Sequence, residues 1–207
     1  MLLWANLWRS ITSLQVYLAS LLALSAIAGD LLVDYSQKHV YRALFDNATH
    51  AVIGGLSWLI VCLNYRDRNA SNTLFEIITC TAVSSLIDLD HFAMARSWSL
   101  KDATSLKYRP PLHTTTVPVV IIPIMLYLSY LFHLHSLQRY SLILFTAFIT
   151  HHTRDATRRG YWFYPLGTTP AIPYAGYMVI TLLIPYLICG CLYFYKIKKL
   201  ESPNLDV

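Results

Sequence analysis

The sequence predicts an all-α fold, a polytopic bundle of about six transmembrane helices with a polar histidine and aspartate layer at one membrane face. Its 207 residues are 56% hydrophobic and only 13% charged, which is too apolar for an ordinary soluble domain. Its apolar segments approach the roughly 20 residues that a helix needs to cross a bilayer. Its histidines and aspartates gather where these segments begin or end.

The predicted spans are residues 13–33, 43–63, 73–94, 116–135, 140–157 and 174–195. We expect the whole chain, 1–207, to form a single integral membrane domain. The fifth segment is apolar only from Tyr140 to Thr150, so it fits either a full span or a partly re-entrant segment. Arg9, the apolar run after it and Ala26-Ile27-Ala28 resemble a signal peptide with its cleavage site. The run of about 20 residues that reaches Leu32 favours a retained helix.

Composition also limits the partners. The net charge of +5 is divided among short loops rather than forming a continuous basic face, which argues against nucleic acid. The four cysteines lie in apolar segments without paired metal-ligand spacing, so they are expected to be packing residues. The lipid bilayer is the expected partner, and no protein partner is predicted.

Alternate crossing of the membrane would bring polar residues from distant segments to one face. Glu76, His133 and His135 would lie at the opposite face, and we predict that they are not ligands. The converging residues are Asp30, Asp34, Asp46, His50, Asp88, Asp90, His91, Arg109, His113, His151, His152 and Asp155.

Asp46 and His50 are spaced i and i+4, which places both side chains on one face of a helix. The His50 ring can bind a metal ion while Asp46 orients the ring or binds too. Alternatively, Asp46 caps the start of the helix and His50 is satisfied by a neighbour.

Asp88, Asp90 and His91 follow an apolar run, where ionisable side chains are costly and usually functional. On a regular helix Asp88 and His91 share a face, whereas Asp90 points away, so a common site requires the helix to end near Ile87. Alternatively, this is a solvated helix end whose aspartate pairs with Arg96.

His151 and Asp155 again have the i, i+4 spacing of two ligands on one helix face, with His152 on another side. Three arginines nearby either anchor the helix at lipid headgroups or bind an anionic substrate: Arg154, Arg158 and Arg159.

The segment Arg109-Pro-Pro-Leu-His113 adds an arginine and a histidine in a stiff, non-helical backbone. Together the four segments offer imidazole nitrogens and carboxylate oxygens, a mixture suited to zinc, manganese or iron.

These four segments resemble the YdjM-like family of membrane-bound metal-dependent hydrolases. That family has an Asp-x-x-Thr-His start, a Pro-Asp-x-Asp turn, a His-Arg-Gly-x-Thr-His-Ser loop and a His-x-x-x-Asp helix end. The corresponding segments, within residues 46–167, are Asp46-Asn-Ala-Thr49-His50, Ile87-Asp88-Leu-Asp90, Tyr108-Arg109-Pro-Pro-Leu-His113-Thr114 and His151-His-Thr-Arg-Asp155.

Three positions depart from the family pattern. Tyr108 replaces the first loop histidine, Pro110 replaces the loop glycine, and Ile87 replaces the turn proline. The first change removes one possible ligand and the second alters the loop backbone, whereas the third leaves both carboxylates in place. The resemblance therefore implies a metal site more securely than it implies turnover.

The resulting hypothesis is a metal-dependent hydrolase that cleaves a lipid or lipid-linked ester or phosphoester at the membrane interface. One or two divalent ions, with zinc the first choice, would activate a water molecule. Asp88 would take the proton and Arg109 would stabilise developing negative charge. The predicted ligands are His50, Asp90, His113, His151 and Asp155, with Asp46, His91 and His152 as possible additional ones.

Two other hypotheses remain open at this stage. The same residues could serve a non-catalytic membrane protein: a metal-binding scaffold, a degenerate hydrolase or an ion carrier. Alternatively, the polar residues could be helix caps and interfacial pairs without a metal ion.

Overall fold

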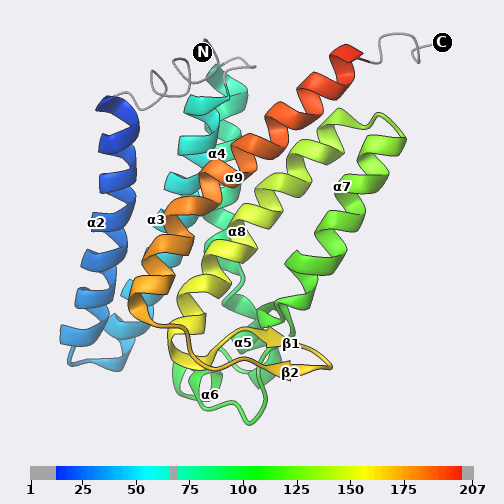
Figure 1. Cartoon of the computed structure of the whole chain (residues 1–207). Coiled ribbons are helices and arrows are strands. Elements are labelled where there is room, and N and C mark those ends of the chain that lie inside the picture. The colour runs from blue at the N-terminus through cyan, green and yellow to red at the C-terminus, as the bar shows by residue number, and fades with distance from the viewer. Residues whose placement is uncertain (1–12, 66–69, 202–207) are drawn as a thin grey trace.

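The computed structural model describes residues 13–65 and 70–201, and within them it is an all-α bundle, as predicted (Figure 1). Each predicted span corresponds to helical structure. The long segments are α2 (Ser13–Tyr35), α3 (His39–Asn64), α4 (Ala70–Leu86) followed by α5 (Leu89–Ala95), the π-helical turn η2 (Val117–Ile121) followed by α7 (Ile122–Leu131), α8 (His135–Arg159) and α9 (Tyr174–Glu201).

Four helical segments in the described part of the chain are long and apolar enough to cross a membrane: Leu14–Tyr35, His39–Asn64, Asn72–Ala95 and Tyr174–Phe194. A shorter apolar helix covers Val117–Leu131. Large apolar side chains on the outer faces, such as Leu24, Ile124 and Leu187, are exposed, which suits a hydrocarbon environment. Helix α8 is continuous over the predicted fifth span but more polar than these four, and its side chains are largely buried among the others.

Helix α3 lies at the centre and packs against α2, α4, α8 and α9. Its close approach to α4 depends on Gly54, because a Cβ atom at this position would overlap the Ser84 side chain. Trp58 and Val61 of α3 then join Leu142 and Ile143 of α8 in one buried apolar cluster. This packing fixes the ends of α4 and α8 relative to α3.

The third predicted span is interrupted where the sequence requires it. Helix α4 ends at Leu86 and α5 begins at Leu89, which confirms that the helix ends near Ile87. Ile87 itself is buried, and Asp88 makes no side-chain capping bond to α5. The interruption leaves the carboxylates of Asp88 and Asp90 available to other partners.

Short elements close one end of the bundle (Figure 1). These are α6 (Leu100–Thr104), the 3₁₀ turn η1 (Pro111–His113) and a two-stranded antiparallel hairpin of β1 (Trp162–Phe163) and β2 (Gly167–Thr168). The Thr115 backbone N–H donates to Trp162 O at 2.7 Å, and Thr116 Oγ1 donates to Tyr164 O at 2.8 Å. The hairpin therefore holds the loop that carries His113.

Candidate metal centre

The candidate ligands come from four separate parts of the chain and meet at the closed end of the bundle. Helix α3 supplies His50, and the α4–α5 turn together with the first residues of α5 supplies two aspartates and a histidine. The turn η1 supplies one histidine, and α8 supplies a histidine and an aspartate. The residues that meet are His50, Asp88, Asp90, His91, His113, His151 and Asp155.

Two histidine nitrogens and two carboxylate oxygens face one another at the centre of this cluster. His113 Nε2 lies 3.3 Å from His151 Nε2. Asp88 Oδ1 is 3.3 Å from the first nitrogen and 3.6 Å from the second. Asp155 Oδ2 is 3.5 Å and 3.7 Å from the same two nitrogens. Adjacent ligand atoms of a tetrahedral zinc ion are about 3.3 Å apart, so these separations suit a small divalent cation.

The other nitrogen of each ring has a protein acceptor. His151 Nδ1 lies 2.9 Å from the Ser84 carbonyl oxygen, and His113 Nδ1 lies 3.3 Å from Asp90 Oδ2. When both Nδ1 atoms donate, both Nε2 lone pairs face each other beside two carboxylates. That arrangement is repulsive without a cation, either a proton or a metal ion. Holding one ring nitrogen so that the other can bind metal is the usual role of such acceptors.

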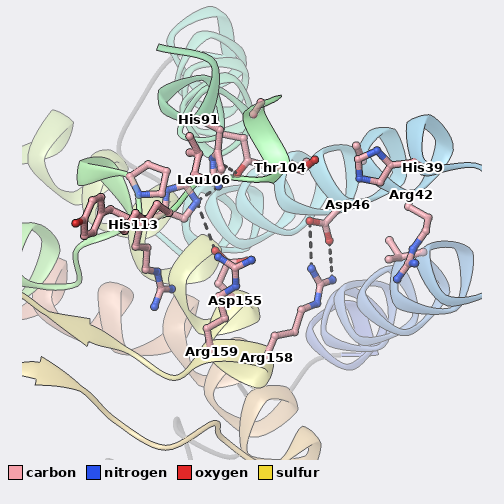
Figure 2. A pocket seen from close by; sticks show the side chains of 18 of the residues that line it. His39, Arg42, Asp46, His91, Thr104, Leu106, His113, Asp155, Arg158 and Arg159 are labelled. Atoms are coloured by element: carbon pink, nitrogen blue, oxygen red, sulfur yellow. Dashed lines mark hydrogen bonds and ion pairs between the residues drawn. The ribbon is translucent and has the colours of Figure 1, made fainter. Parts of the chain in front are cut away.

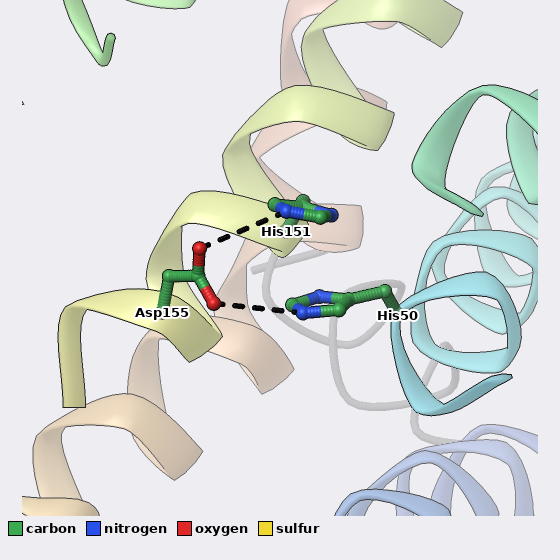
Figure 3. Close-up of side chains that lie close together, drawn as sticks. All are labelled: His50, His151 and Asp155. Atoms are coloured by element: carbon green, nitrogen blue, oxygen red, sulfur yellow. Dashed lines mark ion pairs between the residues drawn. The ribbon is translucent and has the colours of Figure 1, made fainter. Parts of the chain in front are cut away.

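Two groups of three residues could each hold an ion. The first contains His50, His151 and Asp155, and the second contains Asp88, His91 and His113. In the first group the two imidazole rings stack with centroids 3.7 Å apart, and His50 Nε2 lies 3.5 Å from Asp155 Oδ1 (Figure 3). The i, i+4 spacing on α8 thus places both of its ligand candidates in one group, as expected.

His113 lies outside the predicted spans and is almost fully buried. Although burial lowers its pKa, the hydrogen-bonded carboxylates of Asp88 and Asp90 raise that pKa to about 9. The carboxylates therefore favour positive charge at this imidazole, as they would favour a metal cation in its place.

Asp90 and His152 have supporting positions rather than positions at the centre. Asp90 Oδ2 lies 3.3 Å from His113 Nδ1 and accepts a hydrogen bond from the Leu112 backbone N–H at 2.8 Å. Asp90 therefore orients both the loop and the His113 ring. His152 Nε2 contacts the Leu112 carbonyl oxygen at 2.9 Å. Asp88, for which the sequence suggested a role as base, places Oδ1 beside His113 Nε2 at the centre.

A buried ion network lies next to the centre and was not predicted as such. Arg154 is only 1% exposed; its guanidinium group pairs with Asp30 and Asp46 and lies 3.2 Å from His50 Nε2. Arg158 adds a second bond to Asp46. Asp46 lies inside α3, which begins at His39, so the interpretation of Asp46 as a helix cap was wrong. Arg154 likewise neither anchors at the surface nor faces a substrate.

A cavity of about 520 Å³ opens onto the second group of ligands (Figure 2). Asp88, His91, His113 and Asp155 form part of its wall, so a small molecule in the cavity would reach the candidate metal centre. Tyr108, at the position of the family's first loop histidine, also lines the cavity.

Comparisons with known proteins show relatives along most of the chain. It is 38% identical to "Transmembrane protein 267" of Danio rerio over 86% of this chain and 79% of the relative. The Xenopus laevis protein of that name is 41% identical over 73% and 69%, and the Bos taurus protein is 34% identical over 92% and 89%. The chain matches no family model and no solved structure, so the resemblance to YdjM-like hydrolases stays a prediction. With its apolar helices and these relatives, the chain is a membrane protein that belongs to the transmembrane protein 267 family.

Proposed function

We propose that this is a multi-pass membrane hydrolase that uses divalent ions, zinc as first choice, to cleave a lipid or lipid-linked ester or phosphoester. The observation that carries the proposal is the pair of three-residue groups beside a cavity. Three protein ligands per ion leave one coordination position open, which is the pattern of catalytic rather than structural zinc sites. The resemblance to YdjM-like hydrolases supports the same chemistry.

Such ions supply an activated water molecule at neutral pH. Asp88 approaches the centre through Oδ1 and lines the cavity, so its other carboxylate oxygen can accept the water proton. Arg109, held by its Nη1 bond to the Gly160 carbonyl oxygen at 3.1 Å, stabilises negative charge on the substrate. The water oxygen bonds to carbon or phosphorus, the bond to the alcohol oxygen breaks, and the proton passes to the alcohol.

The test combines metal content with turnover. We expect about two transition-metal ions per chain in detergent-purified protein, measured by mass spectrometry, and metal-dependent hydrolysis of lipid esters or phosphoesters in mixed micelles. His50→Ala and His151→Ala each remove a ligand and should abolish hydrolysis. His135→Ala, an exposed histidine at the opposite end of α8, should retain both metal and activity. A folded parent protein without metal after reconstitution with zinc, manganese and iron would exclude the proposal.

A second candidate function has its own observation. A single ion bound by His113, His151, Asp88 and Asp155 would have four protein ligands, and five of the six separations between their ligand atoms are 3.3–3.7 Å. Closed four-ligand sites are structural, so this arrangement favours a metal-binding scaffold without turnover. One ion per chain, removed by chelation with loss of thermal stability and without any hydrolysis, would support the scaffold over the hydrolase.

A further inference from the structure

The cavity beside the metal centre is lined by basic as well as acidic side chains. Its acidic and histidine side chains belong mainly to the candidate ligands and their neighbours. The basic side chains come from three elements that are distant in sequence: α3, the loop before η1, and the end of α8. They are Arg42, Lys107, Arg109, Arg158 and Arg159.

Only one of these five cations is neutralised by a carboxylate in the described part of the chain. Arg158 pairs with Asp46 at 2.7 Å (Figure 2). Arg42, Lys107, Arg109 and Arg159 have no carboxylate oxygen within 4.0 Å among residues 13–65 and 70–201. Four cations that line the cavity therefore have no carboxylate in ion-pair contact.

Arg109 and Arg159 are connected through the backbone at the end of α8. Arg109 is half-buried, and its Nη1 donates to the carbonyl oxygen of Gly160, the residue that follows Arg159. Burial lowers the pKa of Arg109, Asp155 raises it, and the positive charge of Arg159 lowers it further. Asp155 offsets part of the repulsion between these two guanidinium groups, and an anion bound between them would offset more of it.

The shape and charge of that anion can be specified. A phosphate group presents several charged oxygens, enough for a metal ion and for the paired N–H donors of two guanidinium groups. A carboxylic ester is uncharged in its ground state and would leave these cations without a partner. The cations without a carboxylate partner therefore distinguish between the two substrate classes that the proposed function allows.

We infer that the cavity binds the phosphate group of a phosphate ester, with Arg109 and Arg159 contacting the phosphoryl oxygens that face away from the metal centre. Cleavage of the phosphate ester rests on the proposed function. Binding of the phosphate group does not, since the two arginines belong to neither metal-ligand group. Lys107 and Arg42 also line the cavity and add to the attraction for the anion.

The first experiment measures binding of inorganic phosphate to the detergent-purified full chain by calorimetry, with acetate as the comparison anion. We expect phosphate to bind and acetate to bind much more weakly. Arg159→Gln and Arg109→Gln should each weaken phosphate binding by about tenfold or more, because each removes a charge-assisted contact. Arg109→Lys, which keeps the charge but loses the paired donors, should give an intermediate affinity.

The matched control is Arg96→Gln. Arg96 is exposed near the same end of the bundle but does not line the cavity, so this variant should bind phosphate like the parent. Unchanged thermal unfolding of each variant establishes that it is folded. A parent that does not bind phosphate, or glutamine variants that bind it as tightly as the parent does, would overturn the inference.

Metal content measured on the same samples separates this inference from the proposed function. Metal without phosphate binding would refute the inference and leave the hydrolase proposal standing. Arginine-dependent phosphate binding in a chain that takes up no metal would support the inference and refute the hydrolase.

A second arm identifies the source of the phosphate group. Phosphatidic acid in detergent micelles and soluble glycerol 3-phosphate carry the same kind of headgroup, and diacylglycerol serves as the uncharged control. Stronger displacement of inorganic phosphate by phosphatidic acid would indicate a lipid substrate, and equal displacement would indicate a soluble one. Failure of both phosphate esters to displace inorganic phosphate would contradict the inference.

Discussion

Helices α4 and α8 carry buried charge at both of their ends, but the two clusters are built differently. Near the starts of the helices, Arg139 Nε and Nη2 donate to the two carboxylate oxygens of Glu76 at 2.8 and 2.7 Å. Trp58 Nε1 adds a bond of 3.2 Å to the same carboxylate, and its ring lies 5.4 Å from the Arg139 guanidinium. Within the described residues, this anion and this cation neutralise each other.

At the other ends of α4 and α8 the charges are not balanced in this way. Asp88, Asp90 and Asp155 have only histidine partners among their ion pairs in the described part of the chain. This cluster also opens onto a cavity, whereas Glu76 and Arg139 do not line it. Burial of charge alone therefore does not mark a candidate metal centre, whereas buried carboxylates with only histidine partners beside a cavity do.

The largest expected effect is at the cluster of Glu76 and Arg139. Glu76→Ala would leave the Arg139 guanidinium buried without its anion, at a cost of about 3–5 kcal/mol in unfolding free energy. Denaturation of the detergent-solubilised protein measures this loss, and the double variant Glu76→Leu/Arg139→Leu should recover most of it. Metal content of the folded Glu76→Ala protein should stay at the parent value; a loss would mean that the two ends are coupled.

The next effect is a pH dependence of metal affinity. The pKa of His113 is raised to about 9 without metal, so below pH 9 a metal ion must displace its proton. Affinity should therefore rise about tenfold per unit from pH 7 to pH 9, as measured by titration with chelator-buffered zinc. The metal-free protein should show the opposite trend, because the raised pKa contributes stability below pH 6.5 that is lost as pH rises through 9. A flat affinity profile would remove His113 from the ligands.

A smaller effect is expected for a residue that orients a ligand. Asp90→Asn keeps an oxygen for the Leu112 N–H but weakens the acceptor for His113 Nδ1. Metal affinity should fall by about 10–100-fold while some binding remains, as is typical for such partners. Complete loss of metal would instead show that Asp90 is a ligand, as the sequence suggested.

The smallest effect should follow His152→Ala. This change removes the contact with the Leu112 carbonyl oxygen and should cost about 1 kcal/mol of stability. Metal content should be retained, in contrast to His151→Ala one position earlier. Equal metal loss in both variants would contradict the conclusion that His151, and not His152, is a metal ligand.

Much of the fold could be predicted because it depends on segment length and apolarity. All six segments are helical, and the break near Ile87 followed from requiring Asp88, Asp90 and His91 to serve one site. Convergence of the histidines and aspartates followed from alternating helix direction. The hairpin at Trp162–Thr168 was not predicted, because two-residue strands have no measurable periodicity.

The roles within the site were harder to predict. Ser84 orients His151 through a backbone carbonyl, and Leu112 contacts Asp90 through a backbone N–H, and neither group has a signature in the sequence. Arg154 lies in a run of charges of the kind that usually anchors a helix at the headgroups, yet tertiary packing buries it against Asp30 and Asp46. Side-chain type indicated which residues would gather, but not which would face inward.

Gly54 has no functional group, yet it governs an acid–base property of the site. Because Gly54 lets α4 approach α3, the Ser84 carbonyl oxygen lies where it can accept a hydrogen bond from the Nδ1–H of His151. That bond selects one of the two neutral tautomers of the ring and leaves Nε2 as the basic atom. Gly54→Ala, which adds a single methyl group to α3, would therefore change the tautomer of His151 without altering any ligand.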